Sequence, residues 1–389
     1  MHSRAIVSAS QRADNSNEQA VDKGSYDGSL MALDVLDGAQ LLVVTGKGGT
    51  GKTTVAAALA VAAARRGRRT LVVEVEGRQG LAVPFGRRSI GYQEIKLGER
   101  VNGLSVDPEA SLREYLGRYG FAPLARLLSW AKLTTFITAA APGLGDILLV
   151  GKVWEAATRR TRNGRVYDLV VLDAPPTGRV VPFLRAPETV AELARVGPIR
   201  RQADRVKDLL DDPARTAMVL TCLPEELPVT ETIEATGALR AAELPVGAVV
   251  ANRVTADRLA SRASRLPALA RDPRPLLDAA AGAGTQLDKE AITVLLEEAR
   301  DGQRQVTRER RLLKELRTKL EGLPVVELPL LTGGVTGPEA VRTLAARLAD
   351  SPLASEAGTT RAGETEDRSR RGATRAGSKQ APAGAEARR

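Results

Sequence analysis

The stretch LLVVTGKGGTGKTTVAAAL at residues 41–59 carries two lysines in one glycine-rich loop. Residues 46–53 fit the pattern G-x-x-x-x-G-K-[ST], with Lys52 and Thr53 at its last two positions. An apolar run precedes the pattern, and a stretch of helix formers follows it. Glycines in such a loop let successive backbone N–H groups face one concavity, where the N-terminus of the next helix also attracts phosphate oxygens. The pattern predicts a nucleoside-triphosphate site, with ATP and Mg²⁺ as its ligands.

Each residue of this loop has an expected task. Lys52 should contact the β- and γ-phosphates, and the Thr53 hydroxyl should join the Mg²⁺ shell. The residues predicted to bind the nucleotide here are Gly46, Gly48, Gly49, Thr50, Gly51, Lys52, Thr53 and Thr54. A glycine-rich turn without a ligand is the alternative, which the strand and helix patterns around the loop disfavour.

A carboxylate stands at the end of a second apolar run, YDLVVLD at 167–173. Asp173 can organise Mg²⁺ through water there, so Thr53 and Asp173 are the predicted metal ligands. A helix N-cap before the following prolines is the structural alternative for this aspartate. The loop at 175–178, with two prolines and a glycine, can act as a switch because losing the terminal phosphate removes its contacts.

Composition removes several other chemistries. With one cysteine (Cys222) and one histidine (His2), the chain has no disulfide framework, no Cys/His zinc site and no Ser-His or Cys-His nucleophile. Carboxylates, lysines and backbone amides must therefore carry any catalysis. No apolar run approaches the roughly 20 residues that span a bilayer, and residues 1–36 lack the apolar stretch of a secretion signal. We expect a cytoplasmic protein.

Continuous apolar runs alternate with helical stretches along the chain. Such runs are typical of strands buried on both faces. They lie at 41–45, 70–75, 167–173, 216–222, 246–252 and 324–330. This order predicts an α/β protein with a doubly wound, mostly parallel sheet, a P-loop NTPase fold whose ligand loops follow the carboxyl ends of the strands.

Three segments differ from that alternation. Residues 108–163 contain no strand-like run and predict a helical insertion on the sheet domain. Residues 286–321 form a charge-interleaved helical stretch broken only by Gly302, and a solvated helix covering the sheet is favoured over a binding arm. The predicted boundaries are a disordered leader at 1–36, an ATPase domain at 37–350 and a disordered tail at 351–389.

The net charge of +10 does not by itself indicate a nucleic-acid partner. Residues 355–389 carry eight Lys/Arg against five Asp/Glu and no apolar residue larger than Ala, so solvated disorder is favoured over a tether to nucleic acid or anionic membrane. Aromatic residues are only 3% of the chain, which disfavours a platform for stacking single strands. We predict no specific nucleic-acid partner.

The loop G-K-G-G-T-G-K-T-T and the run DAPPTGR at 173–179 resemble those of the ArsA-type anion-pump and guided-entry ATPases, whose second motif reads D-T-A-P-T-G-H. The runs VTGKGGTGKTT, LVVEVEGRQGLA, APGLGDILLVGK and VYDLVVLDAPPTGR are similar to one member of a pair of actinobacterial Get3-like ATPases. The likeness covers about residues 40–350. It implies a deviant Walker A fold of the SIMIBI type, in which two subunits sandwich ATP and Lys47 of one reaches the phosphates bound by the other.

The position of Lys47 agrees with that implication. A lysine in the first half of the loop cannot easily fold back onto the γ-phosphate that Lys52 serves, yet it can project across an interface as an arginine finger does. A solvated loop lysine is the alternative. Because the chain has one phosphate loop, a second subunit must supply the facing half. The resemblance favours a heterodimer with a paralogous ATPase subunit and leaves a homodimer open.

The run EVEGRQG at 74–80 departs from the family, which has D-P-A-x-S there with an Asp that positions the attacking water. The matching carboxylate is Glu76, to which we assign a catalytic role beside Lys47, Lys52 and Asp173. Its extra methylene moves the oxygens by about 1 Å, and a displacement of that size can cost roughly a hundredfold in rate. Slow hydrolysis, or hydrolysis only with a partner, is the predicted consequence, and a structural role for Glu76 is the alternative.

Cysteine and methionine content departs from the family too. Arsenite pumps bind As(III) through several thiols, and eukaryotic guided-entry ATPases hold their dimer with a C-x-x-C zinc site. Neither fits a chain whose single cysteine lies inside an apolar run, which indicates a core residue. Three methionines cannot form a Met-rich client groove, which weakens tail-anchor targeting. The Leu-rich insertion could line an apolar groove, but packing onto the sheet is favoured.

Further residues carry over by position. Asn252 matches the asparagine that contacts the adenine edge, and the loop 327–337 resembles the adenine loop, with Pro329 and Leu330 near the base. Ordinary turn chemistry is the alternative for both. Gly143 and Asp146 match an element, P-G-x-x-[DE], that joins the helical insertion to the switches.

These observations predict a Mg²⁺-dependent ATPase, a phosphoanhydride hydrolase, that works as a nucleotide-sandwich dimer and couples ATP to a conformational switch. One alternative is a weakly hydrolysing or non-hydrolysing regulatory subunit of a heterodimer. The other is a partitioning ATPase of the ParA/MinD kind, which predicts steep salt-dependent DNA affinity or a C-terminal amphipathic helix. Residues 337–350 are too short and too Arg-balanced for such an anchor.

Overall fold

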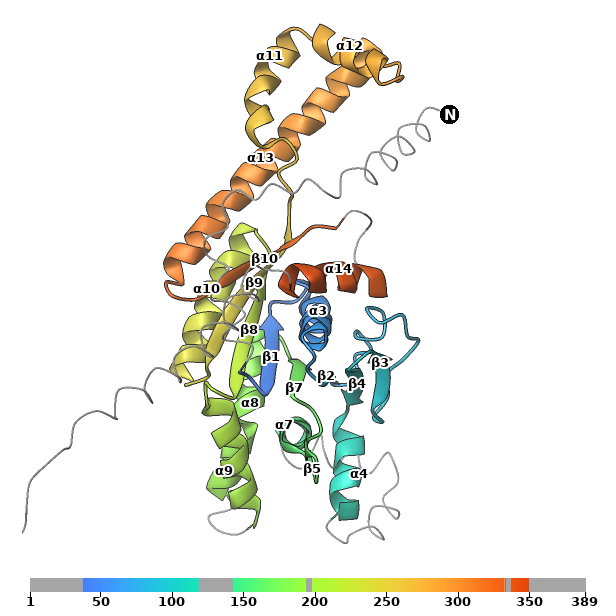
Figure 1. The fold of residues 1–389 in the computed structure, drawn as a ribbon. Coiled ribbons are helices and arrows are strands. Elements are labelled where there is room, and N and C mark those ends of the chain that lie inside the picture. Colours follow the sequence, from blue (N-terminus) through green and yellow to red (C-terminus); the bar gives the residue numbers. More distant parts are fainter. Residues whose placement is uncertain (1–37, 119–142, 194–197, 332, 334–336, 350–389) are drawn as a thin grey trace, which may run out of the picture.

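The computed structural model describes residues 38–118, 143–193, 198–331, 333 and 337–349 (Figure 1). The leader predicted at 1–36, the tail predicted at 351–389 and the middle of the predicted helical insertion lie outside these residues. The fold below is that of the described part of the chain.

A mostly parallel sheet forms the centre of the molecule. In the described residues it has eight strands in the order β10-β9-β8-β1-β7-β2-β4-β3, and only β3 runs antiparallel to its neighbour. The strands are β1 Leu41–Gly46, β2 Thr70–Val75, β3 Ile95–Gly98, β4 Val101–Val106, β7 Leu169–Asp173, β8 Thr216–Cys222, β9 Val246–Val254 and β10 Val325–Pro329. The predicted P-loop NTPase α/β fold is confirmed, and the loops after β1, β2, β7, β8 and β9 gather at one edge.

Two strands of the main sheet were not predicted. The sequence of β4, VNGLSV, is broken by polar and glycine residues, and β3 is a short, half-exposed edge strand. Gly103 of β4 lets β3 approach, because a Cβ there would collide with the Leu97 side chain. A two-residue strand, β5 Arg160–Thr161, pairs with β6 Gly164–Arg165, so our prediction that 108–163 holds no strand was wrong at its end.

Helices cover both faces of the sheet. Side chains along a strand point alternately to the two faces, and those of β1 are apolar on both. Leu41 and Val43 face one core and Leu42 and Val44 face the other. The helices are α3 Lys52–Arg65, α4 Pro108–Arg118, α7 Leu144–Thr158, α8 Thr177–Leu193, α9 Pro198–Asp211, α10 Glu226–Ala241 and α14 Pro338–Ala349. Helices α3 and α14 pack on one face and α7 to α10 on the other (Figure 1). In the described part of the chain no helix is long and apolar enough to cross a bilayer.

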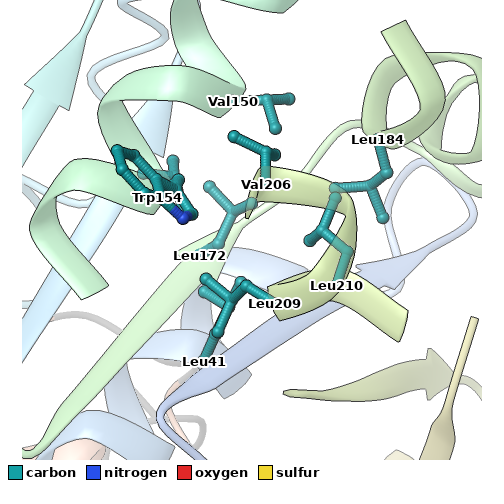
Figure 2. Close-up of a pocket in the computed structure, with 9 residues that line it drawn as sticks. Leu41, Val150, Trp154, Leu172, Leu184, Val206, Leu209 and Leu210 are labelled. Atoms are coloured by element: carbon teal, nitrogen blue, oxygen red, sulfur yellow. The ribbon is translucent and has the colours of Figure 1, made fainter. Parts of the chain in front are cut away.

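Helix α7, from the predicted insertion, packs directly on the sheet. Its residues Leu149, Val150 and Val153 belong to the same buried core as β1 and β7. A narrow apolar pocket lies between α7, α8 and α9 above Leu41 and Leu172 of the strands (Figure 2). The apolar side chains of α7 therefore contact the sheet and its neighbouring helices. The first turn of α7, which contains Asp146, lies at the site described below.

A helical arm projects from the sheet domain (Figure 1). It consists of η1 Ala260–Arg265, α11 Leu266–Arg271, α12 Arg274–Gly282 and the first half of α13 Lys289–Lys319. The arm has a small core of its own around Ile292 and Leu296, whereas Leu313 and Leu316 of α13 join the main core. The helical stretch predicted at 286–321 is confirmed as α13, which runs unbroken through Gly302. Our prediction that it covers the sheet is right only for its second half, because the first half belongs to the arm.

Candidate nucleotide site

The glycine-rich loop between β1 and α3 requires glycine at two positions for steric reasons. A Cβ on Gly46 would collide with the side chain and carbonyl of Thr221 on β8. Gly51 has φ 89°, in the left-handed region, and a Cβ there would collide with the Asn252 amide of β9. Residues of the neighbouring strands β8 and β9 thus contact the loop directly, and only glycine fits at positions 46 and 51.

Hydrogen bonds within the loop converge on the carbonyl of Lys47. Thr50 Oγ1 donates to it at 2.9 Å and Lys52 Nζ donates to it at 3.1 Å. Lys52 is only 8% exposed, and burial lowers the pKa of its amine although Asp173 acts in the opposite direction. Within the described residues no side chain caps the N-terminus of α3, whose first N–H groups are therefore open to an anion.

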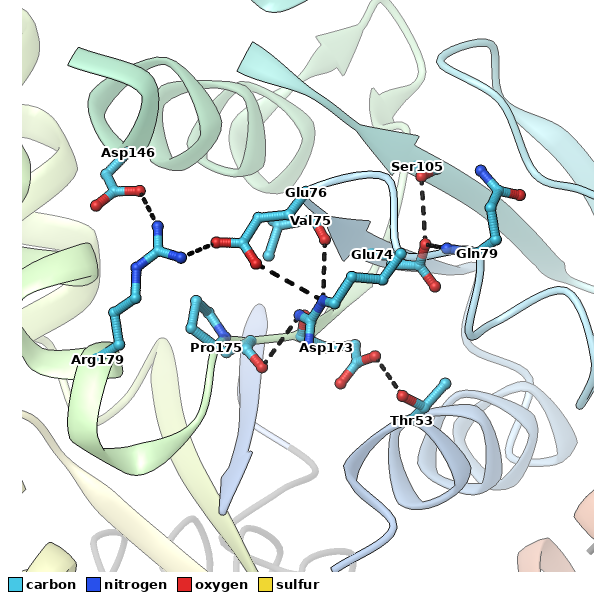
Figure 3. Close-up of polar contacts among 12 residues, drawn as sticks. Thr53, Glu74, Val75, Glu76, Gln79, Ser105, Asp146, Asp173, Pro175 and Arg179 are labelled. Carbon is cyan, nitrogen blue, oxygen red and sulfur yellow. Dashed lines mark hydrogen bonds and ion pairs between the residues drawn. The ribbon is translucent and has the colours of Figure 1, made fainter. Parts of the chain in front are cut away.

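The predicted metal ligands contact each other. Thr53 Oγ1 donates to Asp173 Oδ2 at 2.7 Å, and Asp173 is 1% exposed at the end of β7 (Figure 3). Its other oxygen, Oδ1, is buried without a hydrogen-bond partner, and burial raises the pKa of the carboxyl. A cation would satisfy that oxygen and favour the charged carboxylate. Two hard oxygen ligands beside a phosphate loop fit Mg²⁺, which keeps several waters and binds substrate phosphates.

A buried glutamate that the sequence analysis missed anchors the loop after β2. Glu74 is 1% exposed; its carboxylate accepts hydrogen bonds from the backbone N–H of Leu81 at 2.7 Å, from the backbone N–H of Gln79 and from the Ser105 hydroxyl at 3.4 Å. This residue fixes the segment that follows Glu76 (Figure 3). The signal in the sequence was a single charge inside the apolar run TLVVEV.

Glu76 lies between two arginines. It has φ 69°, unusual for a residue other than glycine, and its carboxylate forms an ion pair with Arg179 of α8. Its second oxygen lies 3.9 Å from Nε of Arg78. Arg78 also donates to the carbonyls of Asp173 at 3.2 Å and Ala174 at 3.4 Å, which joins the ends of β2 and β7. The predicted catalytic carboxylate is therefore held by guanidinium groups in this structure.

Arg179 connects this site to α7. Its second guanidinium nitrogen donates to Asp146 Oδ1 at 2.7 Å, in the first turn of α7 after Gly143 (Figure 3). A cation in the first turn of α8 is unfavourable for the helix dipole, so its two carboxylate partners account for its position. Asp146 and Glu76 thus share one partner, Arg179 of α8. Arg179 itself was missed, although it ends the quoted run DAPPTGR.

Lys47 points to a different partner from Lys52. Its Nζ donates to Glu231 Oε1 of α10 at 2.5 Å, and the Lys47 side chain is 57% exposed. Only folding brings these residues together, because 184 positions separate them in sequence. The amines of the two lysines of the loop therefore have different partners within one protomer.

The residues predicted near adenine lie on β9 and at the end of β10. Asn252 is buried; its Nδ2 donates to the Thr50 carbonyl at 3.0 Å and its Oδ1 accepts from the Arg253 backbone at 3.0 Å. Asn252 thus holds the phosphate loop. Pro329 ends β10, and Leu330 is exposed while its backbone N–H donates to Val254 O at 2.8 Å.

The single cysteine lies away from these groups. Cys222 is fully buried in the core at the end of β8, and burial raises the pKa of its thiol to about 11. Its expected role as a core residue is confirmed. In the described residues there is no group of three or more His, Cys, Asp or Glu side chains that could hold a metal ion.

A phosphate loop between the central strand of a parallel sheet and the next helix, with an aspartate at the end of the neighbouring strand, defines the P-loop NTPase class. Within that class, the Anion-transporting ATPase (ArsA) family model matches residues 39–203 and 192–272. These matches cover more than half of the 389 residues, and the chain belongs to this family of nucleotide-binding ATPases.

Individual relatives agree with the family. ATPase BagA of Mycobacterium tuberculosis (strain ATCC 25618 / H37Rv) is 46% identical over 225 residues, which are 56% of this chain and 66% of BagA. ATPase GET3 of Candida glabrata is 24% identical over 251 residues, 55% of this chain and 71% of GET3. ATPase ARSA1 of Chlamydomonas reinhardtii is 25% identical over 274 residues, 55% of this chain and 35% of ARSA1. The chain thus spans just under two thirds of the mycobacterial relative.

Proposed function

We propose that this chain binds and hydrolyses ATP with Mg²⁺ at the site between β1, β7 and α3. The observation that carries the proposal is the hydrogen bond from Thr53 to the buried Asp173, with one carboxylate oxygen left unsatisfied, beside Lys52 and the uncapped N-terminus of α3. Metal and phosphates together would satisfy all of these groups. Membership in the ATPase family supports the same reaction.

The proposal assigns a task to each residue of the site. The loop amides and Lys52 bind the phosphates, and Thr53 and Asp173 hold the metal ion, which neutralises charge that develops on the phosphate oxygens. Glu76 orients the attacking water, and Arg78 and Arg179 hold Glu76 in place. Asn252 keeps the loop in shape through Thr50. Pro329, Leu330 and Asn252 remain the candidates for the adenine side.

The proposal includes a second subunit. Lys47 lies outside the concavity that Lys52 serves, on an exposed surface, and the chain has one phosphate loop. We therefore place the phosphates of each nucleotide between two protomers, with Lys47 of one reaching the nucleotide of the other. A paralogous subunit of the same family is the favoured partner, and two copies of this chain are the alternative. We place the reaction in the cytoplasm, where ATP is available.

The bond between Arg179 and Asp146 supports a switch. Loss of the terminal phosphate would free the loop after β7, and Arg179 would carry that movement to α7. The engagement of Glu76 by arginines also favours one alternative, a regulatory subunit that hydrolyses ATP slowly. A Glu76→Asp variant that gains turnover would support that alternative, whereas full activity of the isolated wild-type chain would exclude it.

The proposed function is tested by ATP binding and phosphate release in the wild type, in Lys52→Met and in the control Lys96→Met, an exposed lysine of β3. We expect wild-type turnover that requires Mg²⁺, alone or with the paralogous subunit. Lys52→Met should lose about a thousandfold, in the range of a lost transition-state charge. Turnover that survives in Lys52→Met, or a wild type that binds no ATP, would contradict the proposal.

A further inference from the structure

The two lysines of the phosphate loop differ in what their amines contact. Lys52 Nζ donates to the loop's own carbonyl at Lys47, 3.1 Å away, beside the phosphate concavity. Lys47 Nζ donates to Glu231 Oε1 at 2.5 Å, on another helix. In a single protomer, the charge expected to serve a facing nucleotide is therefore already neutralised by a carboxylate of its own chain.

The backbone of Lys47 is held by hydrogen bonds within the loop, whereas its side chain is held by Glu231 of α10. Its carbonyl accepts from the Thr50 backbone at 3.4 Å, the Thr50 hydroxyl at 2.9 Å and Lys52 Nζ at 3.1 Å. Helix α10 is held nearby because β8, which precedes it, pairs with β1, and Thr221 contacts Thr50 at 2.6 Å. With both anchors rigid, Glu231 decides where the Lys47 amine lies.

This ion pair lies on an open surface. The side chains of Lys47 and Glu231 are 57% and 20% exposed, and Leu227, one turn earlier on the same side of α10, is 67% exposed. A flexible lysine stem at such a surface can turn outward without disturbing the core. An exposed leucine beside it agrees with a surface that a second subunit covers.

The geometry points to Glu231 as a positioning residue that holds Lys47 in the unpaired protomer and releases it to the phosphates of a facing subunit. The inference rests on the proposed role of Lys47 across the interface. A single carboxylate and a bound triphosphate compete for the same ammonium group, and the triphosphate carries more negative charge. When the facing subunit holds no nucleotide, Glu231 remains the strongest anionic partner of Lys47. Pairing of the two subunits therefore depends on nucleotide.

The size of the effect follows from the exposure of the pair. Exposed ion pairs contribute little, so removing Glu231 should tighten nucleotide-dependent pairing only about 2- to 5-fold. The effect should also require Lys47, because Glu231 acts through it. A purely structural role of Glu231 would instead change stability in the same way whether or not Lys47 is present.

The contact is tested first in the isolated, nucleotide-free full chain. A carbodiimide joins a carboxylate and an amine in direct contact as an amide, with loss of water, and peptide mapping then identifies the joined residues. We expect the Lys47–Glu231 crosslink in the wild type and in Glu226→Gln, and its loss in Glu231→Gln. Absence of the crosslink in the wild type would overturn the inference.

The consequence is tested by the dissociation constant for pairing, with the same chain or with the paralogous subunit, in Mg²⁺ and a non-hydrolysable ATP analogue. Glu226→Gln is the matched control, since Glu226 lies on the same helix and pairs with Arg311 of α13 at 3.1 Å, whereas Lys47 pairs with Glu231. We expect tighter pairing in Glu231→Gln, no change in Glu226→Gln, and no effect of Glu231→Gln in a Lys47→Met background.

Two outcomes separate the inference from the proposed function. If Glu231→Gln leaves pairing unchanged or weaker, or shifts it equally without Lys47, the positioning role is overturned while the role of Lys47 stands. If Lys47→Met alone leaves analogue-dependent pairing at the wild-type value, the proposed two-subunit function fails, and the positioning role fails with it. Melting temperatures within error of the wild type would confirm that each variant is folded.

Discussion

Two loops at the same edge of the sheet differ in how their key residues are held. In the phosphate loop, hydrogen bonds from Thr50 and Lys52 end on its own backbone, and β8 and β9 leave no room for side chains at Gly46 and Gly51. In the loop after β2, Glu76 depends on Arg179, which also binds Asp146. The comparison separates a rigid loop, to which we assign nucleotide binding, from a second loop, to which we assign hydrolysis and whose Glu76 depends on neighbouring segments.

The largest expected effect tests the metal side of the rigid element. Asp173→Asn removes the charge that should hold Mg²⁺ beside Thr53, so turnover should fall about a hundredfold to a thousandfold. The matched control is Asp168→Asn, a residue adjacent to the other end of β7. Phosphate release measured over a Mg²⁺ titration should separate the two, and equal turnover in both variants would remove Asp173 from the site.

A smaller loss is expected when the shape of the phosphate loop changes. Gly51→Ala places a methyl group against the Asn252 amide at φ 89°, so ATP affinity should fall roughly tenfold to a hundredfold. Gly302→Ala in α13 is the control, because nothing lies within 4 Å of a Cβ there and the residue is outside the loop. Titration with a fluorescent ATP analogue measures both. Wild-type affinity in Gly51→Ala would show that the loop is less rigid than its contacts indicate.

Much of this comparison was predictable from sequence. Continuous apolar runs marked the strands β1, β2 and β7 to β10, the glycine pattern marked the loop between β1 and α3, and the run 167–173 placed Asp173 at the end of β7. The strands β3 and β4 were missed because polar residues interrupt them and because antiparallel edge pairing leaves one strand half exposed. The arm was missed because its small core around Ile292 is separate from the sheet, which a helical pattern does not reveal.

The partners of the site residues could not be predicted in the same way. Glu76 and Arg179 are 103 positions apart, and Lys47 and Glu231 are 184 apart, so only the strand order brings each pair together. Motifs reveal residues whose chemistry is fixed by local spacing. Ion pairs between distant segments depend on the fold. Resemblance to a family does not predict such pairs where the residues of this chain differ from the family's motif.

A moderate effect is expected from breaking the dependence of Glu76 on its neighbours. Arg179→Gln removes the cation that holds Glu76, so kcat should fall about tenfold while KM for ATP changes less than about twofold. Arg179→Lys should recover part of the loss, and Asp146→Asn should lose less than Arg179→Gln. The control is Arg200→Gln, a half-exposed residue of α9 that is ion-paired with Asp204. An equal rise in KM would instead indicate that Arg179 binds the nucleotide.

The smallest effect is expected at the opposite edge of the sheet. Arg69 donates to Asp168 at 2.7 and 3.0 Å, and these hydrogen bonds lower the pKa of the Asp168 carboxyl to about 2. Because the folded-state pKa is depressed, this stabilisation is complete above about pH 4 and is lost as the pH falls through about 2. Asp168→Asn should therefore lower the melting temperature slightly at pH 7 and not near pH 2, with turnover unchanged.

The central claim is that Lys47 serves a nucleotide bound by the facing subunit, and one measurement tests it most directly. Sedimentation with Mg²⁺ and a non-hydrolysable ATP analogue, with and without the paralogous subunit, should show pairing of the wild type and its loss in Lys47→Met. Analogue binding to the single Lys47→Met protomer should remain, because Lys52 and the loop are intact. Pairing of Lys47→Met at the wild-type dissociation constant would contradict the account.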